Sequence, residues 1–570
     1  MIAARWRMAG VVAGVVAPIS TALLALVASS AFAQEPPRAC TVARATTLLS
    51  RGMEQQRDGN SNDALASYHA CLAVDAACTD CWYEMGWSYW KLGEWKHVIT
   101  SWEQALLMQP RHPDIPQYLP SAKQNLEAIE KKLFTHDLRR NVELLISSEP
   151  AEAPVQMTFV GRWQSYNRNV THPLDRFDED IDSPKSVNFS PDGKLIFVNS
   201  LESAKTIVYD SEGTRKRAVI EHRFTPDDTA LFQAKPPFDY SFPKGNKLPN
   251  VFSGKPVEGE FTHGGRYFWA PHYRRSYDEL GRWPSALAII DSSTLKIVRV
   301  LAAGTIAKFV RASVDGKWLA VSHWGDNTVG LFDISADDVA QFKEAELLTV
   351  EQRVPVAQMS GNRDLNCGFC VRGLAFTPDS RHLVVGRMQG GGIAVFDLST
   401  RPRRYLGTID GLAPGPRDLH IDKRGEFLYV SCNATGFIWK VPMRRLLELA
   451  HQAKGQRVKV QADAIGAIAG FAGLGVRSIK ISPNDDYVFA AVNQTSEIVA
   501  LRASDMTIVS RIGVDSYPVG LDLSPDGTQL WVTAQGRKAL GGNSVGAFQV
   551  RYKQNEVIFR TKGPVGVRVE

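Results

Sequence analysis

The sequence predicts a protein of two folded parts, an N-terminal array of paired α-helices followed by a seven-bladed β-propeller. The stretch from Cys40 to about Leu133 has helical periodicity and matches itself at a spacing of 34 residues, which is typical of stacked helix-turn-helix units. From about residue 181 onward, short alternating strands recur with one turn motif in seven copies, which is typical of radially repeated sheets. A chain of 570 residues is also too long for one ordinary core.

The composition predicts a folded chain with no strong electrostatic preference. Hydrophobic residues make up 44% and charged residues 22% of the sequence, values that disfavour a mainly disordered protein. The 66 basic residues exceed the 60 acidic residues by 6, far below the surplus of a dedicated nucleic-acid-binding protein. We therefore expect no nucleic-acid partner.

Residues 1–33 have the features of a cleaved secretory signal peptide. Arg5 and Arg7 precede an apolar run, and the segment ends in the small-residue signature Ala31-Phe32-Ala33, after which a signal peptidase would cut. An uncleaved membrane anchor is the alternative, because the apolar run approaches the length of a membrane span. No later apolar run approaches that length. We expect a periplasmic or secreted protein without a membrane span after cleavage.

Residues 34–135 are predicted to form the helical array. Six positions of the first copy align with six positions of the second: Leu48, Gly52, Gly59, Ala64, Tyr68 and Leu72 with Trp82, Gly86, Gly93, Val98, Trp102 and Leu106. Small residues where helices cross and aromatic residues where they pack are typical of such repeats. A third helix, from about Ile115 to Leu133, is rich in polar residues and is expected to cap the array.

The second copy resembles the tetratricopeptide repeat (TPR), on the residues Trp82-Tyr83-Glu84-Met85-Gly86 with Tyr89, Gly93, Ala105 and Pro110. The first copy departs from the pattern, since Gln55 stands where the aromatic Tyr89 recurs. The resemblance implies a module for contact with another protein. A docking or spacing module inside the chain is the alternative.

The cysteines predict disulfide bonds. Antiparallel helices bring four of them to one end of the array, Cys40, Cys71, Cys78 and Cys81, and a secreted protein favours two disulfides with three possible pairings. A four-thiolate zinc site is the alternative. Cys367 and Cys370 are expected to form a local structural disulfide rather than a redox pair, because the context of a redox motif is missing from the sequence. The seventh cysteine, Cys432, lies in an apolar strand and is expected to be a buried free thiol.

Residues 136–180 are expected to connect the array to the propeller, which takes residues 181–570. The turn motif reads Ser-Pro-Asp-Gly at 190–193 and 524–527, and five variants occur at 262–265, 313–316, 377–380, 422–425 and 482–485. Pro and Asp favour a turn and Gly accepts a positive φ, so each motif predicts a β-hairpin. Several hairpins are followed by a third strand that ends in Asp, which predicts one multi-stranded blade per motif.

These blades resemble the YVTN family of bacterial β-propeller repeats, in which a Pro-Asp-Gly-Lys turn precedes an aromatic residue, Val, Thr or Ser, and Asn. The nearest copies are Asp192-Gly193-Lys194 with Phe197-Val198-Asn199, Gly425 with Tyr429-Val430-Ser431, and Gly527 with Trp531-Val532-Thr533. The resemblance covers about residues 181–561, with weaker copies in the second, third and sixth blades. It implies the propeller fold and leaves the function open, since propellers include enzymes, receptors and scaffolds.

One position in each blade predicts a binding site. The fifth residue before each turn motif begins the innermost strand, and these residues are Lys185, Val257, Lys308, Arg372, Arg417, Arg477 and Val519. Five of the seven are basic and should gather at one mouth of the central channel, where Arg387, His272 and His323 begin loops. Convergent cations predict an anion site. The alternative is structural: these side chains bond neighbouring backbone carbonyls or pair with acids such as Glu258 and Asp418.

We find no motif for catalysis, for a metal ion or for a cofactor. We therefore expect a non-catalytic binding or scaffold protein of the cell envelope. Its helical array would hold a partner protein, and its basic mouth would take an acidic peptide, a glycan or another anion. The alternative is a propeller enzyme, a lactonase-like hydrolase or an amine-dehydrogenase-like oxidoreductase. Such an enzyme should carry a ring of Asp, Asn or Glu around a metal or an intact cofactor motif, whereas the channel positions are mainly Lys and Arg.

Overall fold

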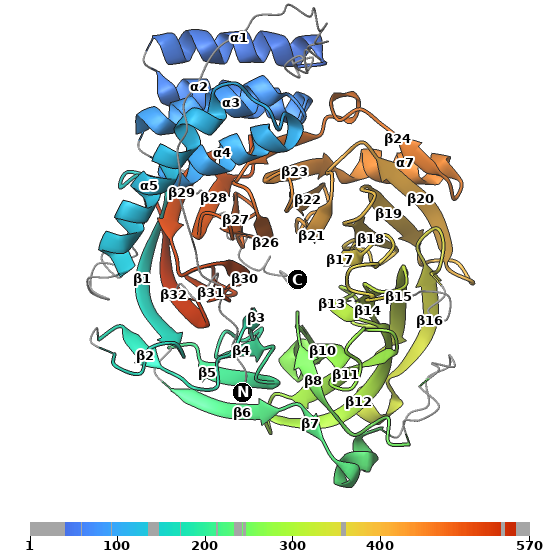
Figure 1. Ribbon diagram of the computed structural model, residues 1–570. Coiled ribbons are helices and arrows are strands. Elements are labelled where there is room, and N and C mark those ends of the chain that lie inside the picture. Colours follow the sequence, from blue (N-terminus) through green and yellow to red (C-terminus); the bar gives the residue numbers. More distant parts are fainter. Residues whose placement is uncertain are drawn as a thin grey trace, which may run out of the picture.

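The structure is a computed structural model. It describes residues 40–134 and 147–553, apart from 59, 93, 171–172, 213–214, 233–241, 243–246, 355–360 and 537–541. The signal-peptide prediction falls on residues 1–33 and so lies outside the described residues. The predicted fold class is confirmed, because a helical N-terminal module precedes a ring of seven sheets (Figure 1).

The helical module contains five α-helices in the described part of the chain. They are α1 (Ala43–Arg57), α2 (Ser61–Val74), α3 (Thr79–Leu92), α4 (Trp95–Met108) and α5 (Ile115–Phe134). The 34-residue repeat has a direct counterpart in the packing. A Cβ atom on Gly52 would lie 2.4 Å from Cε1 of Tyr68, and one on Gly86 would lie 2.1 Å from Nε1 of Trp102. Glycine therefore lets an aromatic ring of the second helix rest on the backbone of the first in both copies.

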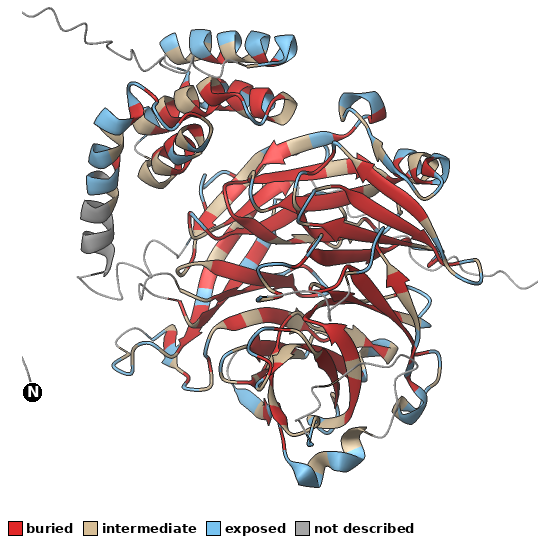
Figure 2. Cartoon of the chain, turned by 45° about the vertical axis from the view of Figure 1, so that its right-hand side comes forward, coloured by how far each residue is buried: buried red, intermediate tan, exposed pale blue. Residues whose placement is uncertain are grey.

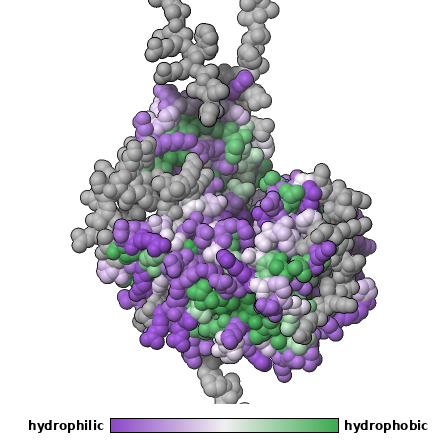
Figure 3. Space-filling model, turned by 60° about the horizontal axis from the view of Figure 1, so that its bottom comes forward, coloured by the Kyte–Doolittle hydropathy of each residue, from purple (hydrophilic) through white to green (hydrophobic). Residues whose placement is uncertain are grey.

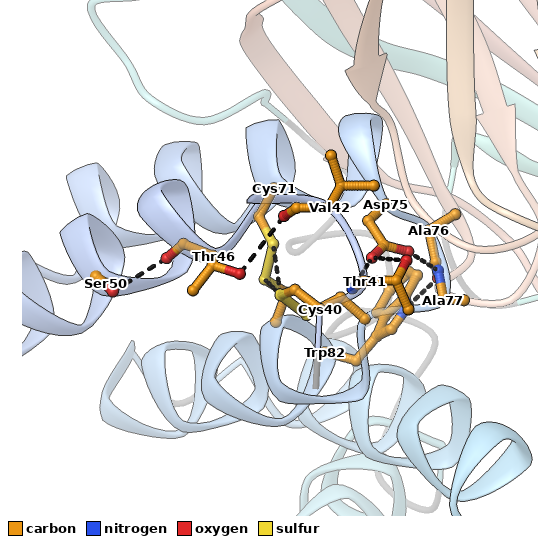
Figure 4. The surroundings of a disulfide bond; sticks show 12 residues. Cys40, Thr41, Val42, Thr46, Ser50, Cys71, Asp75, Ala76, Ala77 and Trp82 are labelled. Atoms are coloured by element: carbon orange, nitrogen blue, oxygen red, sulfur yellow. Dashed lines mark hydrogen bonds between the residues drawn. A yellow bond between two sulfur atoms is a disulfide. The ribbon is translucent and has the colours of Figure 1, made fainter. Parts of the chain in front are cut away.

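The disulfides pair the cysteines as the sequence grouped them. Cys40 bonds Cys78 and Cys71 bonds Cys81, which ties the start of α1 and the end of α2 to the start of α3 (Figure 4). A third bond joins Cys367 to Cys370, and Cys432 is a buried free thiol whose pKa is raised by burial.

The first three blades of the propeller follow one another in the chain. Blade one is β3 (Pro184–Phe189), β4 (Leu195–Ser200), β5 (Lys205–Asp210) and β6 (Lys216–Glu221). Blade two is β9 (Glu260–Thr262), β10 (Tyr267–Arg275), β11 (Pro284–Asp291) and β12 (Lys296–Thr305), extended by β8 (Phe252–Pro256) and β7 (Arg223–Phe224). Blade three is β13 (Ala307–Ala312), β14 (Trp318–His323), β15 (Thr328–Asp333) and β16 (Lys343–Thr349).

In blades four to six, as in blade one, the first four strands follow one another from the channel outward. Blade four is β17 (Val371–Phe376), β18 (His382–Arg387), β19 (Ile393–Asp397) and β20 (Arg404–Asp410), with β24 (Arg457–Lys459) at its edge. Blade five is β21 (Pro416–Ile421), β22 (Phe427–Cys432), β23 (Phe437–Pro442) and β25 (Ile468–Phe471), interrupted by helix α7 (Met443–Ala453). Blade six is β26 (Val476–Ile481), β27 (Tyr487–Val492), β28 (Glu497–Arg502) and β29 (Ile508–Gly513).

The seventh blade joins two distant parts of the chain. It contains β30 (Pro518–Leu523), β31 (Gln529–Ala534) and β32 (Ser544–Tyr552), followed outward by β1 (Val155–Gln164) and β2 (Asp175–Phe177). The stretch expected as a connector therefore supplies the outer strands of the last blade, with Val155 opposite Tyr552. This pairing closes the ring and covers the edge that β32 would otherwise expose.

The propeller core lies between the blades. Most strand residues are buried (Figure 2), and their apolar side chains form clusters that each join two neighbouring blades. In Figure 3 hydrophilic side chains cover much of the visible surface, with apolar patches between them, as is usual for folded domains. Within the described residues, every helix is too short or too polar to cross a membrane.

The helical module packs on the rim of the propeller beside blades five and six (Figure 1). The ring of His69 in α2 stacks on Phe471 of β25 with centroids 4.4 Å apart, and Trp82 of α3 meets the same phenylalanine edge-on at 5.7 Å. Lys96 Nζ donates a hydrogen bond to the carbonyl of Thr495 at 3.1 Å. Helices and blade five therefore share one apolar core.

A buried charge network at this contact predicts a pH dependence. His97 Nδ1 lies 3.0 Å from Glu94, and its Nε2 lies 3.4 Å from Glu497 of blade six. Arg511 of β29 adds a pair with Glu94 at 3.2 Å. Burial opposes the charge on His97, but Glu497 and Glu94 outweigh it and raise its pKa above 6.5. Burial likewise opposes the charge on Glu497, but His97 above all lowers its pKa from 4.5 to about 2.

The stabilisation from His97 is complete below about pH 6.5 and is lost as the pH rises through its raised pKa. That from Glu497 is complete above about pH 4.5 and is lost as the pH falls toward 2. We expect the docked module to resist proteolysis best between these limits. His97→Gln should remove about 1–2 kcal/mol of this stability and flatten the alkaline side of the profile, measured by proteolysis rates against pH. An unchanged alkaline profile would contradict the assignment.

Candidate anion site at the mouth of the central channel

The basic positions predicted from the sequence coincide with irregularities in the innermost strands. In six blades the pairing of the first and second strands slips where the ring residue stands, as between Pro184 and Ser186 around Lys185. A bulge frees a residue from the ladder and redirects its side chain. Five of the six slips include a cation: Lys185, Lys308, Arg372, Arg417 and Arg477. The sixth includes Val519. We call these five cations the cationic ring.

The backbone before each bulge also repeats. Two residues ahead of each bulged position φ is positive, at Ser183, Ile306, Cys370, Gly415, Gly475 and Tyr517, with values of 51°, 55°, 49°, 67°, 78° and 60°. A β-branched residue such as Ile306 rarely adopts this conformation. Backbone held in sparsely populated conformations tends to cluster at functional sites. The six blades therefore present the ring position with the same bent backbone.

The ring cations are close enough to affect one another. Burial is the main cause that lowers the pKa of Arg417 well below its usual value, followed by Arg372 and Arg477. Burial and then Arg372 also lower the pKa of Arg477 to about 10. For Lys308 burial lowers the pKa to about 8, although Asp364 opposes the shift. A cluster in which each cation disfavours the charge on the next favours an added anion.

Two carboxylates face the five cations among the described residues. Arg372 donates a hydrogen bond to Glu258, and Lys308 Nζ donates to Asp364 at 3.3 Å. Burial raises the pKa of Glu258, but the surrounding cations, Arg372 foremost, lower it overall. The pairing with Glu258 that the sequence offered as a structural role is therefore present for Arg372. It leaves a surplus of positive charge.

The next layer of the channel is balanced. Three residues beyond the ring positions, Arg311 pairs with Glu260 at 3.0 Å and Lys480 with Asp522 at 2.9 Å. Asp418 lies 3.6 Å from His420 and accepts a hydrogen bond from the backbone N–H of Ile479 at 3.0 Å, so its partners are not the ring cations. The surplus of positive charge is therefore confined to the mouth of the channel.

The arginines of the ring have unused donors. The Nε atoms of Arg372, Arg417 and Arg477 are buried and have no hydrogen-bond partner among the described residues. Arg417 Nη1 contacts Met388 Sδ at 3.7 Å. Buried donors of this kind cost free energy unless something accepts from them. An oxyanion in the mouth would supply acceptors in the planar arrangement that guanidinium groups bind well.

Aromatic side chains line the same mouth. Lys308 Nζ lies 4.2 Å from the ring centre of Tyr273 and 4.8 Å from that of Trp324. Arg477 lies over Tyr517 at 5.9 Å. These contacts hold the cations in place. A sequence signal existed for Tyr517, which stands two residues before the ring position Val519.

Three residues grouped with the ring from the sequence lie elsewhere. Arg387 is buried in blade four, where it pairs with Glu351 and stacks on Phe369 at 3.8 Å. His272 lies 2.9 Å from His222 inside blade two. Arg387 is the last residue of β18, whereas His272 lies inside β10, which ends at Arg275, and both side chains remain within their blades.

His323 is the third of these residues. Its Nδ1 lies 2.9 Å from Thr328 Oγ1, and its Nε2 accepts a hydrogen bond from the backbone of Gly304 at 3.0 Å. Both ring nitrogens are therefore occupied within blade three, and burial lowers the pKa of His323 to about 3. The neutral imidazole adds no charge to the mouth.

Known structures resemble this chain only at low sequence identity. The chain matches no protein-family model and no curated protein. Hydrazine synthase from Kuenenia stuttgartiensis is 12% identical, with a TM-score of 0.43 over 68% of this chain and 99% of that chain. The β-propeller domain of Cps50 (Swd1) from Myceliophteria thermophila is 12% identical, with a TM-score of 0.44 over 65% and 98%. A functionally unknown protein from Desulfotomaculum acetoxidans is 12% identical, with a TM-score of 0.41 over 64% and 94%. The fold assignment therefore rests on the strand pairing of this chain.

Proposed function

We propose that this chain is a periplasmic or secreted binding protein that holds an anionic ligand, or an acidic group of a partner protein, in the cationic ring. The observation that carries the proposal is the surplus of positive charge at five of six matching bulges, beside a second layer in which the charges are paired. A purely structural set of cations would be paired in both layers.

The other parts of the chain support this assignment. Three disulfides suit an oxidising compartment. The TPR resemblance suits a helical module that contacts another protein, and the YVTN resemblance suits a bacterial propeller. The module is anchored to the rim through Phe471 and the network around His97, so a partner bound to it would stand beside the propeller.

The test uses two ring arginines that lack a carboxylate partner within hydrogen-bonding distance in the described chain, Arg417 and Arg477. Calorimetric titration with L-lactate, inorganic phosphate and an oligoglutamate peptide covers a small carboxylate, a small oxyanion and an acidic chain. The double variant Arg417→Gln/Arg477→Gln should bind the preferred probe at least about thirtyfold more weakly, because losing one partner of a buried charge pair costs about 2–5 kcal/mol.

The matched control removes the same charge from the surface. Lys194→Gln/Arg444→Gln changes two side chains that are 80% and 86% exposed and should bind like the wild type. Equal affinity of the ring variant and the wild type, with both folded by circular dichroism, would rule out the ring as the site.

A further inference from the structure

Lys185 differs from the other cations of the ring. It stands on the bulge of β3, two residues after Ser183 with its positive φ of 51°. Among the described residues its Nζ has no ion pair within 4.0 Å and no hydrogen bond, whereas Lys308 pairs with Asp364. Lys185 is half-buried and lines a cavity of about 40 Å³ together with Glu258. An amine without a partner therefore borders a narrow space.

The surroundings of Lys185 favour its neutral form. Burial lowers its pKa well below the usual value of 10.5, and Arg477, Arg372 and Lys308 lower it further against the opposing effect of Glu258. Enzymes activate lysine as a nucleophile in this way, by desolvation beside another cation. The structure thus combines a reactive amine with neighbouring cations that would bind an anion.

The neighbouring arginines fit a carboxylate. The buried, unpartnered Nε atoms of Arg372, Arg417 and Arg477 belong to planar groups that bind carboxylates in pairs of hydrogen bonds. The cavity of about 40 Å³ is lined by Lys185 and Glu258 and by residues of the next layer such as Arg311, and Glu258 accepts a hydrogen bond from Arg372. It has room for about two or three water molecules, so it suits the small end of a ligand. A carbonyl carbon in this cavity, next to a carboxylate held by the ring arginines, would come close to the Lys185 amine.

We propose that Lys185 forms an imine with the carbonyl carbon of a small oxo acid whose carboxylate is bound by the arginines of the cationic ring. This inference rests on the proposed function, because the same arginines must hold the anion. The ligand class is a two- or three-carbon oxo acid, for which glyoxylate and pyruvate are the probes.

The step balances without an oxidant or a reductant. The nitrogen of Lys185 adds to the carbonyl carbon, and one proton moves from nitrogen to oxygen to give a carbinolamine. Loss of the second proton from nitrogen and of the hydroxyl from carbon releases one water and leaves the carbon–nitrogen double bond. Glu258 lines the cavity with Lys185, its Oε2 is buried without a hydrogen-bond partner among the described residues, and it would carry the proton from nitrogen to the departing hydroxyl. Water reverses the reaction.

The experiment traps the imine by reduction. The full-length protein is incubated with pyruvate or glyoxylate and sodium cyanoborohydride, followed by intact-mass analysis and peptide mapping. We expect one oxo acid attached per chain, on Lys185, at least about tenfold faster than on Lys194, because the buried amine is neutral at a lower pH than an exposed one. Acetone, which has the carbonyl without the carboxylate, should show a smaller preference for Lys185 over Lys194 than pyruvate does.

Two variants separate the amine from the anion site. Lys185→Arg replaces the amine with a guanidinium that cannot form the imine, so it should give no adduct at this position, and lactate titration of the same variant measures how much Lys185 itself contributes to anion binding. Arg417→Gln/Arg477→Gln should lose both lactate binding and the adduct. Labelling spread over surface lysines, with lactate binding intact and Lys185 unmodified, would overturn the imine and leave the proposed function standing. Failure to bind lactate, phosphate or oligoglutamate together with no adduct would overturn both.

Discussion

Replacing Arg162 with alanine is expected to lower the free energy of unfolding of the propeller by about 3–5 kcal/mol, because it leaves buried carboxylates without their cation. Arg162 lies in β1, and its Nε and Nη2 donate to the two oxygens of Asp175 at 3.0 and 3.1 Å. Its Nη1 donates to Asp515, in the turn between blades six and seven, at 3.2 Å. The side chains of Arg162 and Asp175 are 2% and 0% exposed. Burial opposes the charge on Arg162, but Asp515 and Asp175 outweigh it and raise its pKa.

The measurement is chemical unfolding followed by tryptophan fluorescence, since Trp163 stacks on Trp531 across the closing strands at 4.8 Å. The control is Lys553→Ala, which removes an exposed pair with Glu152 between the same two parts of the chain and should have little effect. If the two variants lost similar stability, β1 would not be fixed to the ring by this buried pair.

Replacing Arg417 with methionine is expected to stabilise the ligand-free propeller by about 1–2 kcal/mol while it weakens anion binding. Buried charges that lack a partner can be exchanged for apolar side chains at a gain in stability. Arg417 contacts the sulfur of Met388, its Nε has no partner in the described chain, and Arg372 and Arg477 oppose its charge. A structural role for Arg417 would give the opposite sign, because its removal would destabilise the fold.

The comparison is Lys480→Met in the paired layer below. Lys480 Nζ lies 2.9 Å from Asp522, so this change should cost about 1–3 kcal/mol by leaving a carboxylate unpaired. The measurement is thermal unfolding of the two variants, each with and without the anion that binds best in the calorimetric titrations. It shows whether each substitution raises or lowers the melting temperature. If Arg417→Met without anion had a lower melting temperature than the wild type, Arg417 would stabilise the fold, and its assignment to anion binding would be refuted.

Local patterns in the sequence were sufficient for the helices, the hairpins and the position of the ring. Gly52 and Gly86 share a 34-residue spacing with Tyr68 and Trp102, and the contacts between glycine and aromatic ring repeat in the same way. The turn motifs predicted hairpins because a turn depends on a few adjacent residues. Counting back from each motif reached the bulged residue in six blades, since the inner strands of those blades all have six residues.

Features that join distant segments were decided by the tertiary structure. The pairing of β1 with β32, about 390 residues apart, has no local signal, because strand partners are chosen by the closure of the ring. The choice among three disulfide pairings likewise followed from helix packing. The sequence by itself determined which residue types stand at the mouth. The blade geometry separated Arg387, His272 and His323 from the ring, paired Glu258 with Arg372 and brought in Asp364, because side-chain direction depends on where each strand begins and ends.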